Sequence, residues 1–525
     1  MNRARPSIVT AAALLLLQAC AGDSSSDRPP GDDVVDESAG EDAIAVLTGK
    51  APGVAVIVEY TEGADVDSVT DDLGADYDLN ITSRYHEVFP GAAFIAPDDA
   101  AVAALTADPR VLTVTPDELV SADSITSAAD SELPGAIEEA EAAGEMDTEG
   151  GSAGGDADDE VRTIKQLTPE VQSTGWRLIR GGDSPGDGRG MTVAVIDSGI
   201  DLHHPDLAPA IHSSLGKDCV RRKNKTLQDQ HGHGTHVSGI IAAQHNGFGT
   251  VGIAPAARIV PVRVLDGENA GTDSTVLCGV DYVMRHTGTI DAVNMSIQHD
   301  CGQACSNFDE TPKQRAIKKL IRRDVFVAIC AGNFGTDARW SDPGFIEEGV
   351  TVSNYADFNG KMSSTDHYRQ TSGFGAGVDI GAPGTHILST WVSSKGKHVY
   401  NRITGCSMAT PLVTGAAAVY KQVYGGGPAK IRQMLLEDAR TSYPGRGGDH
   451  PERLLLMRGQ GGPNGTGCGD GVCQGDETDA TCGADCGCDA ALDCNDVAPF
   501  GCYCDPGCGA SKDCCADAAQ VCPAP

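Results

Sequence analysis

Three residues in separate parts of the sequence have the side chains needed for nucleophilic catalysis. Asp197 follows a short apolar run, His233 lies within His-Gly-His-Gly-Thr-His, and Ser407 lies within Gly-Cys-Ser-Met-Ala-Thr-Pro. A serine hydroxyl is a weak nucleophile until a neighbouring base takes its proton, and histidine is well suited to that task. A carboxylate can then orient the ring and stabilise its charged form. The sequence therefore predicts Ser407 as nucleophile, His233 as its base and Asp197 as the orienting carboxylate.

The apolar run after Ser407 predicts a buried helix. Pro411 is expected in the first turn of that helix, where a missing N–H costs no hydrogen bond. Ser407 then lies near the helix N-terminus, where partial positive charge favours an anion that develops beside it. Taken alone, the stretch could also be a turn of small residues between a strand and a helix. The base and the carboxylate elsewhere favour the catalytic interpretation.

The elements that position these residues alternate between strand and helix. Apolar stretches rich in β-branched residues predict strands, and amphipathic or capped stretches predict the helices between them. Such alternation produces a parallel sheet covered on both faces, in which chemistry gathers where the strands end. The predicted strands are 191–196, 259–264, 292–295 and 325–330, and the predicted helices are 237–243, 274–285 and 312–323.

The three motifs, in the chain order Asp, His, Ser, resemble the subtilase family over about residues 166–458. The resemblance implies a subtilisin-like three-layer α/β domain with a parallel sheet over residues 163–460. It implies a serine endopeptidase that forms an acyl-enzyme, with Asn333 as an oxyanion donor beside the Ser407 N–H. The alternative from another class is a surface-binding or adhesion protein with an inactive protease core. The residues implied to bind substrate are Ser296, Cys330, Ala331 and Gly332.

The sequence departs from the family after Ser296, where glycines usually let a substrate backbone pair as an extra strand. Here Ile297-Gln298-His299-Asp300 follows. The pocket rim is therefore expected to differ in shape, with a Cys301–Cys305 disulfide as one option. Ser341 and Asp342 are candidates for the base of the pocket, and no preferred substrate side chain follows from the sequence.

The resemblance further implies a structural calcium ion bound at the loop 244–255. All the implied ligand atoms are oxygens, which is the chemistry that calcium requires. A glycine-rich surface loop without a metal is the alternative. The implied ligands are the side chains of Asp206 and Asn246 and the carbonyls of Gln244, Phe248 and Thr250.

Residues 51–122 are predicted to form a small α+β domain. Strand-like and helix-like stretches follow in the order β-α-β-β-α-β, which is typical of the ferredoxin-like motif. The position of this domain resembles that of the inhibitor-type propeptide of secreted subtilases, and an independent binding domain is the alternative. Residues 123–162 then form an acidic, disordered linker that is open to proteolysis.

The first twenty residues have the pattern of an export signal. Two arginines precede a short apolar stretch that ends in Leu-Gln-Ala-Cys20, which resembles a bacterial lipobox. The protein is expected to be exported, either tethered at the bacterial outer membrane or cell surface by lipid on Cys20 or free outside the cell. Residues 21–50 are acidic and rich in turn-forming residues, and are predicted to be a disordered tether.

Cysteine spacing indicates a disulfide-rich tail. Residues 488–525 resemble a somatomedin-B domain, and 468–487 resemble a short Cys-Gly-Asp-Gly repeat of exported bacterial proteins. Such a knot binds a protein or surface ligand, or only stabilises or spaces the chain. In the central block, Cys330 and Cys406 are either free or paired with each other.

The formal net charge of −35 argues against nucleic acid as a partner. The net negative charge comes from the segments outside residues 161–462, which indicates a modular protein. The expected partners are protein and peptide substrates and the chain's own propeptide.

Overall fold

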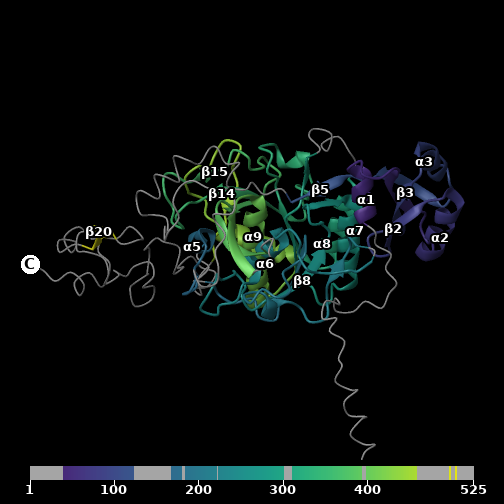
Figure 1. Cartoon of the computed structure of the whole chain (residues 1–525). Coiled ribbons are helices and arrows are strands. Elements are labelled where there is room, and N and C mark those ends of the chain that lie inside the picture. Colours follow the sequence, from purple (N-terminus) through teal and green to yellow (C-terminus); the bar gives the residue numbers. More distant parts are fainter. Residues whose placement is uncertain are drawn as a thin grey trace, which may run out of the picture.

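The computed structural model describes residues 40–122, 167–179, 184–221, 223–300, 310–392 and 398–457 (Figure 1). It also describes the backbone of two short paired strands, β20 (Asp496–Val497) and β21 (Tyr503–Cys504). We call residues 40–122 the N-terminal domain and residues 167–457 the central domain. The expected signal peptide, acidic linker, Cys301–Cys305 pair and disulfide framework of the tail lie outside the described residues.

The N-terminal domain contains a four-stranded antiparallel sheet with the order β2-β3-β1-β4. Between residues 54 and 116 the elements follow the order predicted from the sequence, and the strand β5 (Leu119–Ser121) was not predicted. Asp65 and Asp98 each accept a backbone N–H at a helix start, which fixes where the two helices begin. The elements are β1 (Val54–Tyr60), α2 (Val66–Tyr77), β2 (Asn80–Tyr85), β3 (Gly91–Ala96), α3 (Asp99–Thr106) and β4 (Val111–Pro116).

An additional helix, α1 (Gly40–Leu47), lies within the segment 21–50 that was predicted to be a disordered tether. That prediction is wrong for residues 40–50. Ala43 and Ile44 are buried, and the Glu41 N–H donates to the Val220 carbonyl of the central domain at 2.8 Å. The helix is ordered because it packs against other parts of the chain, which local composition does not reveal.

The central domain is built on a largely parallel sheet with the order β19-β16-β14-β12-β10-β6-β8-β7. Successive residues of β6 point to opposite faces: Val193 and Val195 belong to one hydrophobic core, and Ala194 and Ile196 to another. The strands are β6 (Thr192–Asp197), β7 (Lys217–Asp218), β8 (Arg258–Arg263), β10 (Ala292–Met295), β12 (Phe326–Cys330), β14 (Val350–Ala356), β16 (Ile380–Pro383) and β19 (Arg453–Leu454), and β15 (His367–Tyr368) pairs with β14.

Helices cover both faces of this sheet, as the sequence predicts. The first core contains residues of α6 (His233–Ala242), α9 (Cys406–Tyr424) and α10 (Pro428–Asp438). The second contains residues of α7 (Asp273–Arg285) and α8 (Pro312–Arg322). Smaller elements of the central domain include α5 (Thr174–Leu178), the short paired strands β11 (His299–Asp300) and β13 (Ser341–Asp342), the hairpin β17 (Ile387–Val392) and β18 (His398–Ile403), and the 3-10 turns Ala208–Ala210 and Ala338–Trp340.

The N-terminal domain docks on α7 and α8, on the side of the molecule away from α6 and α9 (Figure 1). Asp281 of α7 is fully buried and accepts three successive backbone N–H groups, those of His86, Glu87 and Val88. Lys319 of α8 donates to the Glu87 carbonyl at 2.6 Å. Further contacts join Tyr85 to the Ser274 carbonyl, Arg323 to Glu87 and Arg315 to Glu59.

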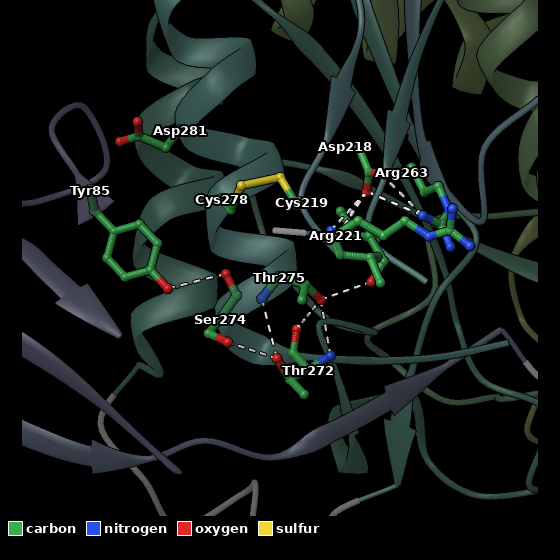
Figure 2. Close-up of a disulfide and its surroundings, with 12 residues drawn as sticks. Tyr85, Asp218, Cys219, Arg221, Arg263, Thr272, Ser274, Thr275, Cys278 and Asp281 are labelled. Atoms are coloured by element: carbon green, nitrogen blue, oxygen red, sulfur yellow. Dashed lines mark hydrogen bonds and ion pairs between the residues drawn. A yellow bond between two sulfur atoms is a disulfide. The ribbon is translucent and has the colours of Figure 1, made fainter. Parts of the chain in front are cut away.

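A disulfide joins Cys219, directly after β7, to Cys278 in the middle of α7 (Figure 2). Both residues are buried. The turn around Cys219 is also held by Asp218, whose carboxylate pairs with the buried Arg263 and accepts the Val220 N–H. This cross-link fixes the edge of the sheet to the helix on which the N-terminal domain docks.

Among the described residues, no helix is long and apolar enough to cross a membrane.

Replacing both Cys219 and Cys278 by alanine is expected to destabilise the protein. The disulfide closes a long loop, with a sequence separation of 59, and such cross-links contribute about 2–4 kcal/mol, chiefly by restricting the unfolded chain. The midpoint of urea unfolding should fall accordingly. An unchanged midpoint in the double variant, with Cys330 and Cys406 intact, would contradict this expectation.

Candidate active site

Asp197 and His233 meet at the carboxyl end of the central sheet. Asp197 is the last residue of β6, and His233 is the first residue of α6. The His233 Nδ1 lies 2.9 and 3.0 Å from the two carboxylate oxygens of Asp197, and both side chains are fully buried. The buried carboxylate therefore holds the ring in one orientation, with Nε2 directed away from it.

A second buried carboxylate, Asp229, shapes the turn that carries His233. One oxygen accepts the N–H groups of His231 and Gly232, and the other accepts the N–H and hydroxyl of Thr235. Gly232 has φ +116°, a conformation that favours glycine. Asp229 was not among the residues predicted from the sequence, although an aspartate two residues before His-Gly-His is a recognisable turn-forming signal.

Ser407 lies in the first turn of α9, but the expectation for Pro411 is wrong. The helix begins at Cys406, so Pro411 lies in its second turn and has no N–H to donate to the Ser407 carbonyl. That carbonyl instead accepts the hydroxyl of Ser296 at 2.9 Å. Ser296 directly follows β10 and also accepts from the Asn294 amide. Its side chain therefore positions the Ser407 main chain.

Asn333 follows β12, beside the start of α9. Its Oδ1 accepts the backbone N–H of Cys406 at 2.9 Å. The donor end of this amide is its Nδ2 group. Gly332, directly before it, has φ +111°. The chain therefore turns sharply at the end of β12 and brings an amide to the residue that precedes Ser407.

The hydroxyl of Ser407 is not hydrogen-bonded to His233 in this structure. Ser407 Oγ lies 3.4 Å from the Ser296 carbonyl, and His233 Nε2 is buried without a hydrogen-bond partner among the described residues. The helices that carry the two residues, α6 and α9, pack against each other. Hydrogen bonds between a nucleophile and its base are often long in a resting enzyme and shorten when substrate binds.

Cys330 and Cys406 are paired in a disulfide. Cys330 is the last residue of β12, and Cys406 is the first residue of α9. Both are completely buried. The cross-link therefore joins the strand that leads to Asn333 to the helix turn that carries Ser407.

A strand of the N-terminal domain, β5 (Leu119–Ser121), lies against this site. It pairs antiparallel with β9 (Ala270–Thr272) of the central domain. On its other side, the Ser121 N–H donates to the Gln298 carbonyl at 3.0 Å, and the Gln298 N–H donates back at 2.8 Å. Gln298 therefore pairs with an added strand even though glycine is absent, which its side chain permits because it points away from the ladder into the protein.

The start of β5 brings acidic groups into a buried cluster. Asp117 accepts the Ser274 N–H at the start of α7, beside Asp273. Lys313 is fully buried between Asp273 and Asp342, at 2.5 and 3.1 Å. Burial, and next the negative charge of Asp273, raise the pKa of Asp117 to about 7.

The predicted calcium loop lies beside Asp206, whose carboxylate is fully buried. In this structure the carboxylate accepts the Asn246 amide at 2.8 Å, the Thr250 N–H at 3.0 Å and the Tyr400 hydroxyl at 3.2 Å. Burial is the main cause that raises the pKa of Asp206 to about 6, and the charge of Glu170 adds to it. Two carboxylates therefore approach one loop, a donor set that suits calcium.

The Asn246 oxygen accepts the Phe248 N–H and would have to turn to bind a metal ion. The Gln244 N–H donates to the Asp206 carbonyl, which keeps the loop beside the carboxylate. Among the described residues, no group of three or more His, Cys, Asp or Glu side chains is placed to hold a metal. An ion here would depend on main-chain oxygens.

Sequence comparisons identify one family. The model of the subtilase family matches residues 188–463. An extracellular serine proteinase of Thermus sp. (strain Rt41A) is 34% identical over 312 residues, which cover 57% of this chain and 69% of the relative. Subtilisin NAT of Bacillus subtilis subsp. natto is 34% identical over 232 residues, 44% of this chain and 55% of its own length. The chain therefore matches 55% to 69% of the length of these two relatives.

A solved structure has a similar fold. Fervidolysin of Fervidobacterium pennivorans, described as a keratinolytic enzyme related to subtilisin, aligns with a TM-score of 0.56 at 21% identity. The alignment covers 77% of this chain and 60% of that structure. At this identity the likeness concerns the fold alone.

Docking of β5 is expected to weaken as pH rises from about 4 to about 7. The pKa of Asp117 is higher in the docked state than the ordinary value near 4, so the docked state holds the proton more tightly and loses stability as that proton leaves. Hydrogen exchange of residues 111–122 in the full chain, corrected for intrinsic rates, measures this. Protection factors should fall over this pH range, and Asp117→Asn should flatten the fall.

Asp98→Asn is the matched control, because asparagine also caps a helix and Asp98 is far from α7. If the wild type and Asp117→Asn lost protection equally, Asp117 would not be the group that responds to pH.

Proposed function

The chain belongs to the subtilase family and is a serine endopeptidase, and we propose that Asp197, His233 and Ser407 are its catalytic triad. The observation that carries the proposal is the buried hydrogen bond between His233 Nδ1 and Asp197, beside the helix that presents Ser407. This geometry leaves His233 Nε2 as the nitrogen that can act as a base. The proposal requires the Ser407 hydroxyl to leave the Ser296 carbonyl and to donate to that nitrogen when substrate binds.

In the proposed mechanism His233 takes the proton of Ser407 as Oγ attacks the carbonyl carbon of the cleaved peptide bond. Asp197 stabilises the resulting imidazolium, which then protonates the leaving amine. The backbone N–H of Ser407 and the Nδ2 group of Asn333 donate to the oxyanion. Water activated by the same histidine then hydrolyses the acyl-enzyme and regenerates Ser407.

We propose that substrates bind as β5 does in this structure, as an added strand between β9 and the segment after Ser296. This places the backbone of Gln298 and the residues Ser296, Cys330, Ala331 and Gly332 beside the substrate. Main-chain pairing of this kind would hold the peptide backbone of different sequences in the same way, because the ladder uses no side chain.

The N-terminal domain is proposed to be an inhibitory propeptide, and the protein a zymogen. Its last described strand occupies the place proposed for substrate, and Val120 and Ala122 are buried there. Asp281 and α8 hold the rest of the domain. The substrate of the first cleavage would then be the chain itself, at a bond shortly after Ala122.

Calcium is proposed as a structural ion at the Asp206 loop. The carboxylate of Asp206, the Asn246 side chain and the carbonyls of Gln244, Phe248 and Thr250 would hold it, with Glu170 close by. The ion would supply stability rather than chemistry.

Export and anchoring are further proposals. The first relative is named an extracellular proteinase, which supports export of this chain, with or without lipid on Cys20. A protein or surface ligand for the segment 488–525 stays a prediction, as do the assignments of the two cysteine-rich segments.

Replacing Ser407 by alanine tests the proposed function. The variant is expected to lose labelling by a fluorophosphonate probe and to lose casein hydrolysis by about 10⁴–10⁶-fold, because the nucleophile is absent. Asn333→Ala should keep labelling detectable and lower kcat by about 10²–10³-fold, as loss of an oxyanion donor does in subtilisin. The Ser407→Ala chain should also stay uncut in the segment that follows Ala122.

Ser442→Ala, an exposed serine of the same domain, is the control and should behave as the wild type. A wild-type chain that neither reacts with the probe nor cleaves casein would instead favour the alternative, a surface-binding protein with an inactive core.

Removing calcium with EDTA is expected to lower the thermal unfolding midpoint of the wild type. Asp206→Asn should remove most of this response, because the carboxylate that balances the charge of the ion is gone. Asp449→Asn, an exposed aspartate in the same domain, should keep the response. No fall in the midpoint with EDTA would refute the calcium site.

A further inference from the structure

The carboxamide of Gln298 is buried without a hydrogen-bond partner. The residue is 1% exposed, and its Nε2 has no partner among the described residues. Its Oε1 lies 3.6 and 3.9 Å from the sulfur atoms of Cys330 and Cys406. Those sulfurs are bonded to each other and carry no hydrogen, so they cannot donate to Oε1. Burying an unsatisfied amide is costly, which indicates that something else pairs with it.

A second unsatisfied group lies close by, across Gly332. A Cβ built on Gly332 would lie 3.7 Å from Gln298 Oε1 and 3.4 Å from Ser341 Oγ. The Ser341 hydroxyl is likewise buried and without a partner in the described part of the chain. We call Gln298, Gly332, Ser341 and the Cys330–Cys406 disulfide the Gly332 site. Its unsatisfied donors are the Nε2 hydrogens and the Ser341 hydroxyl, and Gln298 Oε1, which lies beside the two sulfur atoms, is an unsatisfied acceptor.

The Gly332 site lies directly beside the reacting groups. Gly332 precedes Asn333, and Cys406 precedes Ser407. The backbone of Gln298 pairs with Ser121 of β5, and two residues back from Gln298 is Ser296, whose carbonyl contacts Ser407 Oγ. If a peptide pairs with this segment as β5 does, one of its residues lies opposite Gln298, as Ser121 does. The residue two positions later in the peptide then lies opposite Ser296, beside Ser407. The side chain at that position, just before the cut bond, is the one that borders the Gly332 site.

We propose that Gln298, with Ser341, selects a hydrogen-bond-accepting side chain, of the Asn, Asp, Gln or Glu type, at the residue before the cut bond. The inference rests on the proposed function. An acceptor pairs with the amide and hydroxyl donors, whereas a leucine of similar size would bury them unsatisfied. The chain's own sequence agrees, because Ala122 is followed by Asp123.

The first test uses peptides that differ at one position. Fluorogenic Val-Ser-Ala-Asn and Val-Ser-Ala-Leu amides copy residues 120–122 and then offer either an acceptor or an apolar side chain of similar size. The enzyme purified from expression of the full chain is expected to cleave the asparagine peptide with at least about tenfold higher kcat/KM, the factor that one buried hydrogen bond provides. A higher or equal kcat/KM for the leucine peptide would overturn the proposal.

The second test replaces the amide by an apolar side chain of the same length. Gln298→Met should remove the preference for asparagine and raise the relative rate on leucine. Gln433→Met, on the exposed face of α10, should keep the wild-type preference. A Gln298→Met enzyme that kept the preference would also overturn the proposal.

Mass spectrometry of casein fragments made by the wild type keeps the inference testable if Gln298→Met fails to fold. Fragments ending mainly in Asn, Asp, Gln or Glu support it, and fragments ending mainly in large apolar residues refute it. Failure of the proposed function looks different: neither peptide nor casein is cut, and the fluorophosphonate probe does not react.

Discussion

The parallel alignment of β6, β10 and β12 is the constraint on which the site depends. These neighbouring strands run in the same direction, so Asp197, Ser296 and Asn333 leave the sheet at one edge. Helices on both faces bury the strands completely, so a strand that shifted its register by one residue would exchange side chains between the two cores and disrupt the packing of both. The packing of apolar side chains, which takes no part in the chemistry, therefore brings together site residues that are far apart in sequence.

Much of this arrangement could be predicted because it is encoded locally. Apolar strands, capped helices and the motifs around Asp197, His233 and Ser407 each carry their own signal, and the predicted parallel sheet is found. The features that could not be predicted depend on contacts between distant segments. Helix α1 is ordered only because Ala43 and Ile44 find partners, and the environment of Gln298 depends on a disulfide whose cysteines lie 76 positions apart.

Pro411 shows how local rules can mislead. The rule that proline favours the first turn of a helix placed the start of α9 too late. A proline deeper in a helix frees a carbonyl, and here the freed carbonyl belongs to Ser407 and is satisfied by Ser296. In a helix without this proline, the Ser407 carbonyl would accept an N–H from within the helix. Here it accepts the Ser296 hydroxyl, so a residue outside the helix holds the main chain of Ser407.

The contacts between the N-terminal domain and α7 and α8 have a consequence for where the enzyme acts. Every covalent path from residues 1–39 to the central domain passes through β5 and the linker after it. If lipid on Cys20 anchors the chain and the linker is then cut, non-covalent contacts hold the enzyme to its anchor, among them the ladder of β5, the N–H groups around Asp281 and the salt bridges of α8. Dissociation of one interface would then both open the active site and free the enzyme from the cell surface, so that it could not be active while still anchored through that domain.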